Sequence, residues 1–248
     1  METAPEPAPD PRQEQRARRV EALAAAVTAA GSDRERRRRL DPLRMAAYAG
    51  FEPASAALSQ LGFTPPAPEE PHLESFLQAI PGGKVGQVVA ACAVARAVML
   101  VARRAVKEGW LEEDAATLAI EAAECWLDAP SSEGELATRD AAETAQEAHE
   151  QRLNAQRLFR TPGDATLEVG YATRAAELAA RAAYAPSEAD ARAELLAQLH
   201  PASMALINPE LKADSPERWV ALQMVQREWI LPAVQAALIE WALRLRGS

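Results

Sequence analysis

The chain has 248 residues, enough for one large domain or two small ones. Apolar residues make up 48% and charged residues 25%, as in ordinary globular proteins, and the formal net charge is -9. The pI near 5.0 argues against nucleic-acid binding. The first residues are acidic and rich in proline, with no apolar run behind them, so we expect no secretory signal and a cytoplasmic protein.

Alanine dominates the apolar residues, and aromatic residues are only 5% of the chain. Alanine is the best helix former, and it also lets helix backbones approach closely. The composition therefore predicts an all-α fold, an antiparallel bundle or array of about 8–10 helices. Basic residues are almost all arginine, which together with alanine indicates GC-rich codons and a bacterial origin.

The N-terminal third contains three expected segments. Residues 1–11 form a proline-rich tail that we expect to be disordered. Helices are expected over 12–63, near 12–30, 41–49 and 53–61. Gly31, Ser32 and Asp33 should break and cap the chain, and Asp33 can start the helix that follows the first. Four prolines in 64–71 predict an exposed linker.

Residues 72–248 are predicted to form the main helical domain. The apolar run at 85–106 is interrupted by Arg96 and predicts a buried helix rather than a membrane span. We expect Cys92 and Cys125 to be small core residues of a reducing compartment. Pro232 should kink the last helix. The turn residues and prolines place long helices near 84–107, 112–128, 133–158, 164–184, 187–200 and 216 onward. Ser132 and Glu135 fit a capping box at the start of the helix near 133–158.

Catalytic motifs are missing from the sequence. His72, His149 and His200 lie in no metal-binding or di-iron pattern. The glycines at 82–86 lack the spacing of a phosphate loop, and the pair Glu121 and Glu124 has no partner histidine. We therefore expect a protein that is not an enzyme and uses no cofactor or metal.

Charge is concentrated in one segment. Residues 101–150 carry 13 Asp or Glu against four Arg or Lys, which equals the imbalance of the whole chain. Spacings of three, four and seven residues place the acids on one side of each of two helices, opposite apolar positions. The predicted acidic stripe consists of Asp114, Glu121, Glu124, Asp128, Asp140, Glu143, Glu147 and Glu150. The predicted packing faces opposite it are Leu111, Ala115, Leu118, Ala122, Cys125 and Trp126, and then Ala137, Ala141, Ala145 and Ala148.

Three interpretations of the acidic stripe stay open at this point. Like charges on one helix side repel, and a basic protein partner would relieve that repulsion and be steered toward it. A solvated face that only keeps the protein soluble is the plain alternative. The third is internal pairing with the basic cluster Arg34, Arg36, Arg37, Arg38 and Arg39.

Two stretches carry a family resemblance. Residues 43–50, LRMAAYAG, with Ala54 to Leu58, and residues 118–130, LAIEAAECWLDAP, resemble alanine-rich helical proteins of myxobacteria and their relatives. These belong to the fifth class of polymorphic-toxin immunity proteins, and the likeness covers about 40–185. It implies a cytoplasmic protein that binds and neutralises a toxin, often one encoded by a neighbouring gene. Trp126 and Tyr48 match the pattern and fit core positions.

The C-terminal segment holds a row of apolar and aromatic residues at helical spacing. Core packing is the plain interpretation, and an exposed tryptophan ridge for a partner or a homodimer is the sharper one. The alternative function is accordingly a helical scaffold or regulatory adaptor, with an unrecognised enzyme third. The row comprises Trp219, Leu222, Val225, Trp229 and Ala233, continued by Val234, Ala237, Leu238 and Trp241.

Overall fold

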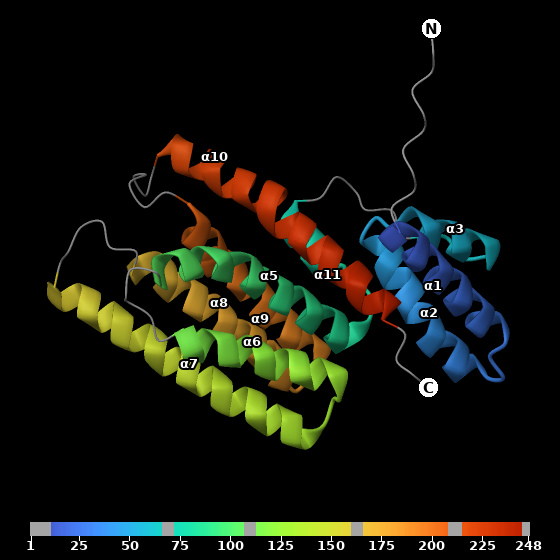
Figure 1. The fold of residues 1–248 in the computed structure, drawn as a ribbon, viewed down its shortest axis with the longest axis horizontal. Coiled ribbons are helices and arrows are strands. Elements are labelled where there is room, and N and C mark those ends of the chain that lie inside the picture. Colours follow the sequence, from blue (N-terminus) through green and yellow to red (C-terminus); the bar gives the residue numbers. More distant parts are fainter. Residues whose placement is uncertain (1–10, 66–71, 107–112, 160–165, 208–214, 245–248) are drawn as a thin grey trace, which may run out of the picture. The chain divides into compact units, whose positions relative to one another are not determined.

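A computed structural model describes residues 11–65, 72–106, 113–159, 166–207 and 215–244. Regular structure in these ranges is helical and includes no strand, which confirms the all-α fold (Figure 1). The expected tail lies outside the described residues up to residue 10, as do residues 66–71 of the expected linker.

The chain divides into two compact units. The first comprises Met1–Pro68 with Ile239–Ser248, and the second comprises Glu69–Leu238. The sequence alone had assigned the last residues to the main domain.

The first unit contains α1 (Pro11–Thr28), α2 (Asp33–Tyr48) and α3 (Glu52–Gln60), which pack against one another. The Ser32 hydroxyl accepts the Glu35 N–H at 3.2 Å and caps α2. The prediction of a separate helix beginning at residue 41 was wrong, because α2 is continuous and contains Pro42. Leu40 before that proline and Leu43 and Ala46 after it are buried, and this packing stabilises the helix on both sides of it.

Glycine ends both α2 and α3 in the same way. Gly50 (φ +89°) and Gly62 (φ +80°) take the left-handed conformation that favours glycine. The Phe51 N–H then bonds the Ala46 carbonyl at 3.0 Å, and the Phe63 N–H bonds the Leu58 carbonyl at 2.9 Å. Each helix therefore ends in a Schellman motif.

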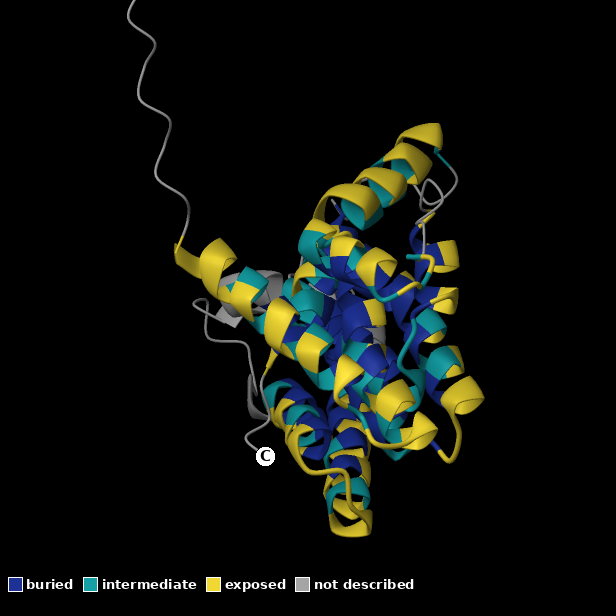
Figure 2. Cartoon of the chain, turned by 90° about the vertical axis from the view of Figure 1, so that its right-hand side faces the viewer, coloured by how far each residue is buried: buried dark blue, intermediate teal, exposed yellow. Residues whose placement is uncertain are grey.

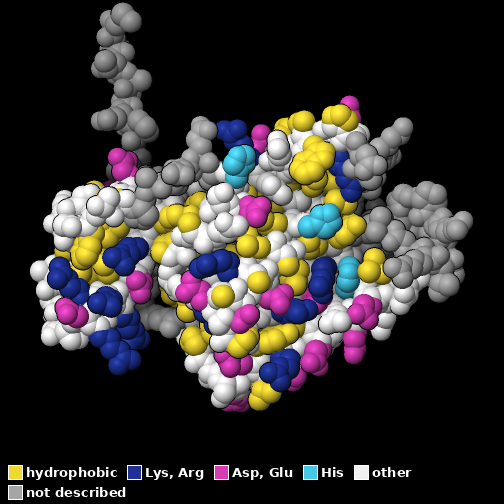
Figure 3. Space-filling model, turned by 180° about the vertical axis from the view of Figure 1, so that it is seen from behind, with side chains coloured by type: hydrophobic (Ala, Val, Ile, Leu, Met, Phe, Trp, Pro, Cys, Tyr) yellow, Lys and Arg dark blue, Asp and Glu magenta, His cyan; other side chains and the backbone are white. Residues whose placement is uncertain are grey.

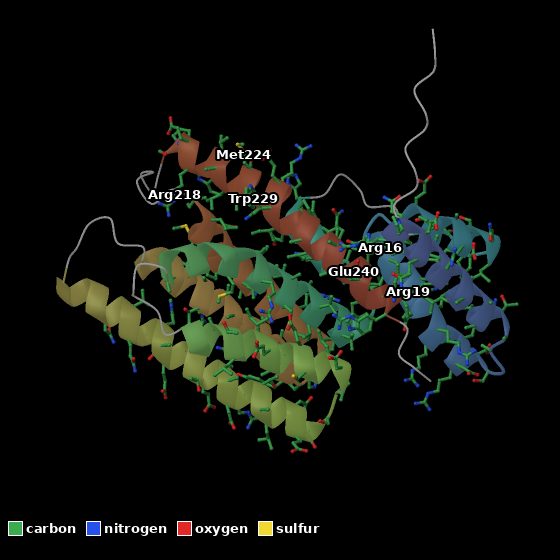
Figure 4. All side chains as sticks on the ribbon, viewed as in Figure 1. Arg16, Arg19, Arg218, Met224, Trp229 and Glu240 are labelled. Carbon is green, nitrogen blue, oxygen red and sulfur yellow. The ribbon has the colours of Figure 1, made fainter. Side chains whose placement is uncertain are left out.

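The end of the chain completes the first unit. Arg16 of α1 pairs with Glu240, and the Arg19 guanidinium donates to the Leu243 carbonyl at 3.1 Å (Figure 4). Ala242 and Leu243 are buried. The first unit thus uses residues from both ends of the sequence.

In the second unit, α8 is the central helix. It contacts α5, α6, α7 and α9. The Gln198 side-chain amide donates to the Ala91 carbonyl at 3.0 Å and the Ala175 carbonyl at 2.6 Å, linking α9 to α5 and α8. The helices before the C-terminal segment are α4 (Leu73–Gln78), α5 (Gly83–Val106), α6 (Glu113–Asp128), α7 (Ser132–Phe159), α8 (Thr166–Tyr184) and α9 (Glu188–Leu206).

Alanine makes this central position of α8 possible. Its buried alanines have no atoms beyond Cβ, so neighbouring helices can approach on several sides. They are Ala172, Ala175, Ala176, Ala179, Ala180, Ala182 and Ala183.

Two predicted helix boundaries differ in detail. Ser131, not Ser132, caps α7, because its hydroxyl accepts the Gly134 N–H at 3.1 Å. Glu135, expected in a capping box, instead pairs with Lys84 at 3.1 Å. The helix expected to end near His200 continues through Pro201 to Leu206.

The C-terminal segment consists of α10 (Pro216–Val225), a π-helical turn η1 (Gln226–Ile230) and α11 (Leu231–Leu243). A kink was expected at Pro232, and the structure has a π turn just before it. Proline lacks an N–H and its ring clashes with the carbonyl four residues earlier, here that of Glu228. The wider turn lets the Leu231 N–H bond the Gln226 carbonyl instead.

Candidate protein-binding surfaces

The acidic stripe on α6 is only partly available to a partner. Glu121 and Asp128 are exposed, but Glu124 is half-buried and held by Arg96 of α5. The two guanidinium–carboxylate contacts are 3.0 Å and 2.7 Å. The hydrogen bond to Glu124 is the main reason the pKa of Arg96 lies above its ordinary value. The side chain of Asp114 lies outside the described residues.

The predicted packing face of α6 was rotated from the real one. Leu118 is 53% exposed, Cys125 is exposed and Ala122 is half-buried, although all three were expected inside. Ala115 and Trp126 are buried as expected, and Leu111 lies outside the described residues. The residues that pack are Ala115, Ala116, Ala119, Ile120, Ala123, Trp126 and Leu127.

The acidic stripe on α7 is exposed along its length. Asp140, Glu143, Glu147 and Glu150 are all exposed, and none forms an ion pair within the described residues. Among the residues that the structure describes, only the Gln146 amide donates to one of these carboxylates, that of Glu150, at 2.8 Å. These four carboxylates project from the side of the helix opposite its packing side. We call them the α7 acidic face.

The packing side of α7 was predicted in part. Ala145 and Ala148 are buried as expected, whereas Ala137 is exposed and Ala141 is half-buried. Thr138 and Ala142 take the inner positions instead.

The basic cluster has local partners in the first unit. Arg39 pairs with Glu35 and donates to the Ala26 carbonyl at 2.7 Å. The guanidinium carbons of Arg36 and Arg44 lie 5.6 Å and 5.7 Å from the centre of the Phe63 ring. Figure 3 shows basic side chains gathered on this unit, whereas acidic and basic side chains are mixed over the second. Among the described residues of the second unit, the cation that pairs with the acidic stripe is Arg96. Pairing of the stripe with the basic cluster, which belongs to the first unit, stays a prediction.

The C-terminal tryptophans are the clearest departure from core packing. Trp219 is 66% and Trp229 is 63% exposed, so the plain interpretation was wrong for both. Val220 (56%) and Met224 (52%) are exposed beside them. No residue of α10 is buried, and the helix is drawn only in the exposed and intermediate colours (Figure 2).

The other residues of the predicted row differ in how far they are buried. Val234 and Leu238 are buried. Those that are half-buried are Leu222, Val225, Ala233, Ala237 and Trp241.

The histidines are dispersed. The His149 Nδ1 atom lies 2.8 Å from the Gly170 carbonyl, and the His200 ring meets Tyr171 edge-on. His72 lines an open hollow of about 450 Å³ beside α10. No group of three potential metal ligands occurs within the described ranges.

One buried charge was missed by sequence reasoning. Glu177 of α8 is fully buried and pairs with Arg174 and Arg181, with 3.4 Å to the latter. Its spacing of three and four residues from these arginines is the signal that was available. Both arginines belong to α8 and are partly exposed, and Arg181 also pairs with Glu194 of α9 at 3.1 Å, so this group links α8 to α9.

No known family model matches the chain, and no curated protein or solved structure shows significant similarity to it. Among the helices described, none combines the length and the apolar character that crossing a membrane requires.

Proposed function

We propose that this protein binds another protein and acts as an immunity-type inhibitor of a basic bacterial toxin through the α7 acidic face. One observation carries the proposal: four exposed carboxylates on one helix side have no ion-pair partner within the described residues. The resemblance of residues 40–185 to immunity proteins points the same way.

The α7 acidic face suits electrostatic recognition. Four like charges within three helix turns repel one another weakly, by a few tenths of a kcal/mol for each neighbouring pair. A cationic surface would relieve this repulsion and would associate faster because of the field. On the neighbouring helix α6, Glu121 and Asp128 are also exposed, while Glu124 is already neutralised by Arg96.

A growth assay tests the proposal. The product of the adjacent reading frame is expressed in a bacterium with and without this protein, and protection is scored as growth. The triple variant Glu143→Lys, Glu147→Lys, Glu150→Lys should lose protection and bind that product at least about tenfold more weakly.

The matched control reverses three exposed acids elsewhere, Glu21→Lys, Glu52→Lys and Glu74→Lys, with the same change in net charge. It should protect as the parent does. Equal protection by both triple variants would remove the α7 acidic face from the mechanism. A harmless neighbouring product, or one that kills regardless, would rule out immunity toward it.

A second candidate is a scaffold or regulatory adaptor, favoured by the exposure of Trp219 and Trp229. Exposed tryptophans are frequent anchors of protein interfaces. Deleting everything after residue 214 is a poor test, because it would also remove Leu243 and Glu240 from the first unit. The double variant Trp219→Ala, Trp229→Ala separates the candidates: adaptor binding is lost, whereas immunity through α7 is kept.

A further inference from the structure

One side of α10 and η1 carries four exposed residues in a single stripe. Glu217, Val220, Met224 and Arg227 are separated by three, four and three residues, which keeps them on one side of a helix. Val220, Met224 and Arg227 also line the same open hollow of about 450 Å³, together with His72 and Leu73. We call these four residues the α10 stripe.

The α10 stripe is self-complementary. It runs from an acid through two apolar residues to a base. When a second copy lies antiparallel about a two-fold axis through the middle of the stripe, Glu217 meets Arg227 and Val220 meets Met224. The two-fold axis generates each of these pairs twice, so every residue of the stripe has a complementary partner in the second copy.

The apolar residues of the α10 stripe are exposed, and its charged ends are not held in ion pairs in the part of the chain that the structure describes. Neither Glu217 nor Arg227 forms an ion pair within the described residues. Hydrogen bonds from its own backbone N–H and from Ser215 lower the pKa of Glu217, so the carboxylate stays charged. Val220 and Met224 are more than half exposed, and α10 buries none of its residues.

We propose that the α10 stripe is a homodimer interface, occupied by the same stripe of a second copy in antiparallel orientation. The opposite charges at its ends fix the direction, and the apolar centre is removed from water. The hollow beside the helix gives the apolar side chains of the second copy a place to pack. The 15 residues of α10 and η1 span roughly 22 Å, so the interface is small and the dimer should be weak.

The test measures the mass of the full chain in solution by sedimentation velocity, from about 1 µM to about 500 µM. The parent should shift from 26.7 kDa toward twice that mass as concentration rises. Glu217→Arg and Arg227→Glu should each weaken the dimer at least about tenfold, because each places like charges together twice. The double variant Glu217→Arg, Arg227→Glu should restore the parent dissociation constant to within about threefold.

Glu52→Arg and Arg34→Glu are the matched controls. Glu52 is also an acid in the first turn of a helix, and Arg34 is an exposed helical arginine. Neither should change the dissociation constant, and far-UV circular dichroism should show equal helical content in all variants. A parent that stays monomeric throughout, single reversals without effect, or a double variant that fails to recover would each overturn the proposal. Because no toxin takes part in this measurement, its result is independent of the immunity proposal.

Discussion

Two cysteines that look alike in the sequence occupy opposite environments. Cys92 is buried in α5, as expected, whereas Cys125 is exposed on α6, where a core position was expected. Burial is the main reason the pKa of the Cys92 thiol lies far above its ordinary value; nearby Glu124 raises that pKa further, and Arg96 opposes the shift. Only the thiolate reacts with disulfide reagents, so the two residues should differ sharply in reactivity.

The native protein at pH 8 should therefore expose one reactive thiol, and both should react after unfolding in urea. The Cys125→Ala variant should show no rapid reaction in the native state. Since the raised pKa keeps Cys92 protonated in the folded state only, its contribution to stability should fall as pH rises above the ordinary thiol range. Two rapidly reacting thiols in the native parent would contradict the burial of Cys92.

At the scale of helices, the alanine-rich core of α8 should tolerate little added volume. Ala179 is fully buried in this helix, which packs against four others. Ala179→Leu should lower the free energy of unfolding by about 1–3 kcal/mol, because the extra atoms have no space. Ala137→Leu, on the exposed side of α7, should change it by less than about 0.5 kcal/mol. Urea denaturation measures both, and equal values would show that α8 is loosely packed.

The same abundance of alanine explains which parts of the helices could be predicted. Helix positions follow from local signals, such as the Ser32 cap and the glycines after α2 and α3. The phase of α6 could not be fixed, because apolar residues lie on most of its circumference and two faces look equally suited to packing. The structure uses the other of these two faces, so Leu118 and Cys125 are exposed and Ile120 is buried.

The sequence alone also could not predict which residues contact one another in the folded protein. The spacing of the acidic stripe was predicted, but the pairing of Glu124 with Arg96, 28 residues earlier, depends on how α5 packs against α6. Periodicity likewise placed Trp219 at a helical spacing without showing whether another helix covers it. The exposure of α10 became known only from the fold.

At the scale of the whole chain, the two structural units differ in net charge. The first unit carries 12 Arg or Lys against 10 Asp or Glu, and the second carries 15 against 26. The net charges are therefore +2 and -11. The second unit holds the α7 acidic face, the α10 stripe and the α8 core, so both proposed binding surfaces depend on the folding of that unit.

The fragment 69–238 should fold by itself, because α8 and the helices around it all lie within it. Circular dichroism should show strong helical signal and one cooperative urea transition. The fragment 1–68 should be poorly helical alone, since it lacks Glu240, which pairs with Arg16, and the buried Leu243. Adding a peptide of residues 231–248 should raise its helical signal, whereas the same peptide carrying Glu240→Lys and Leu243→Ala should do so much less. If fragment 69–238 is unfolded while the full chain is folded, the second unit needs the first for its stability, and the two surfaces cannot be assigned to an independent domain.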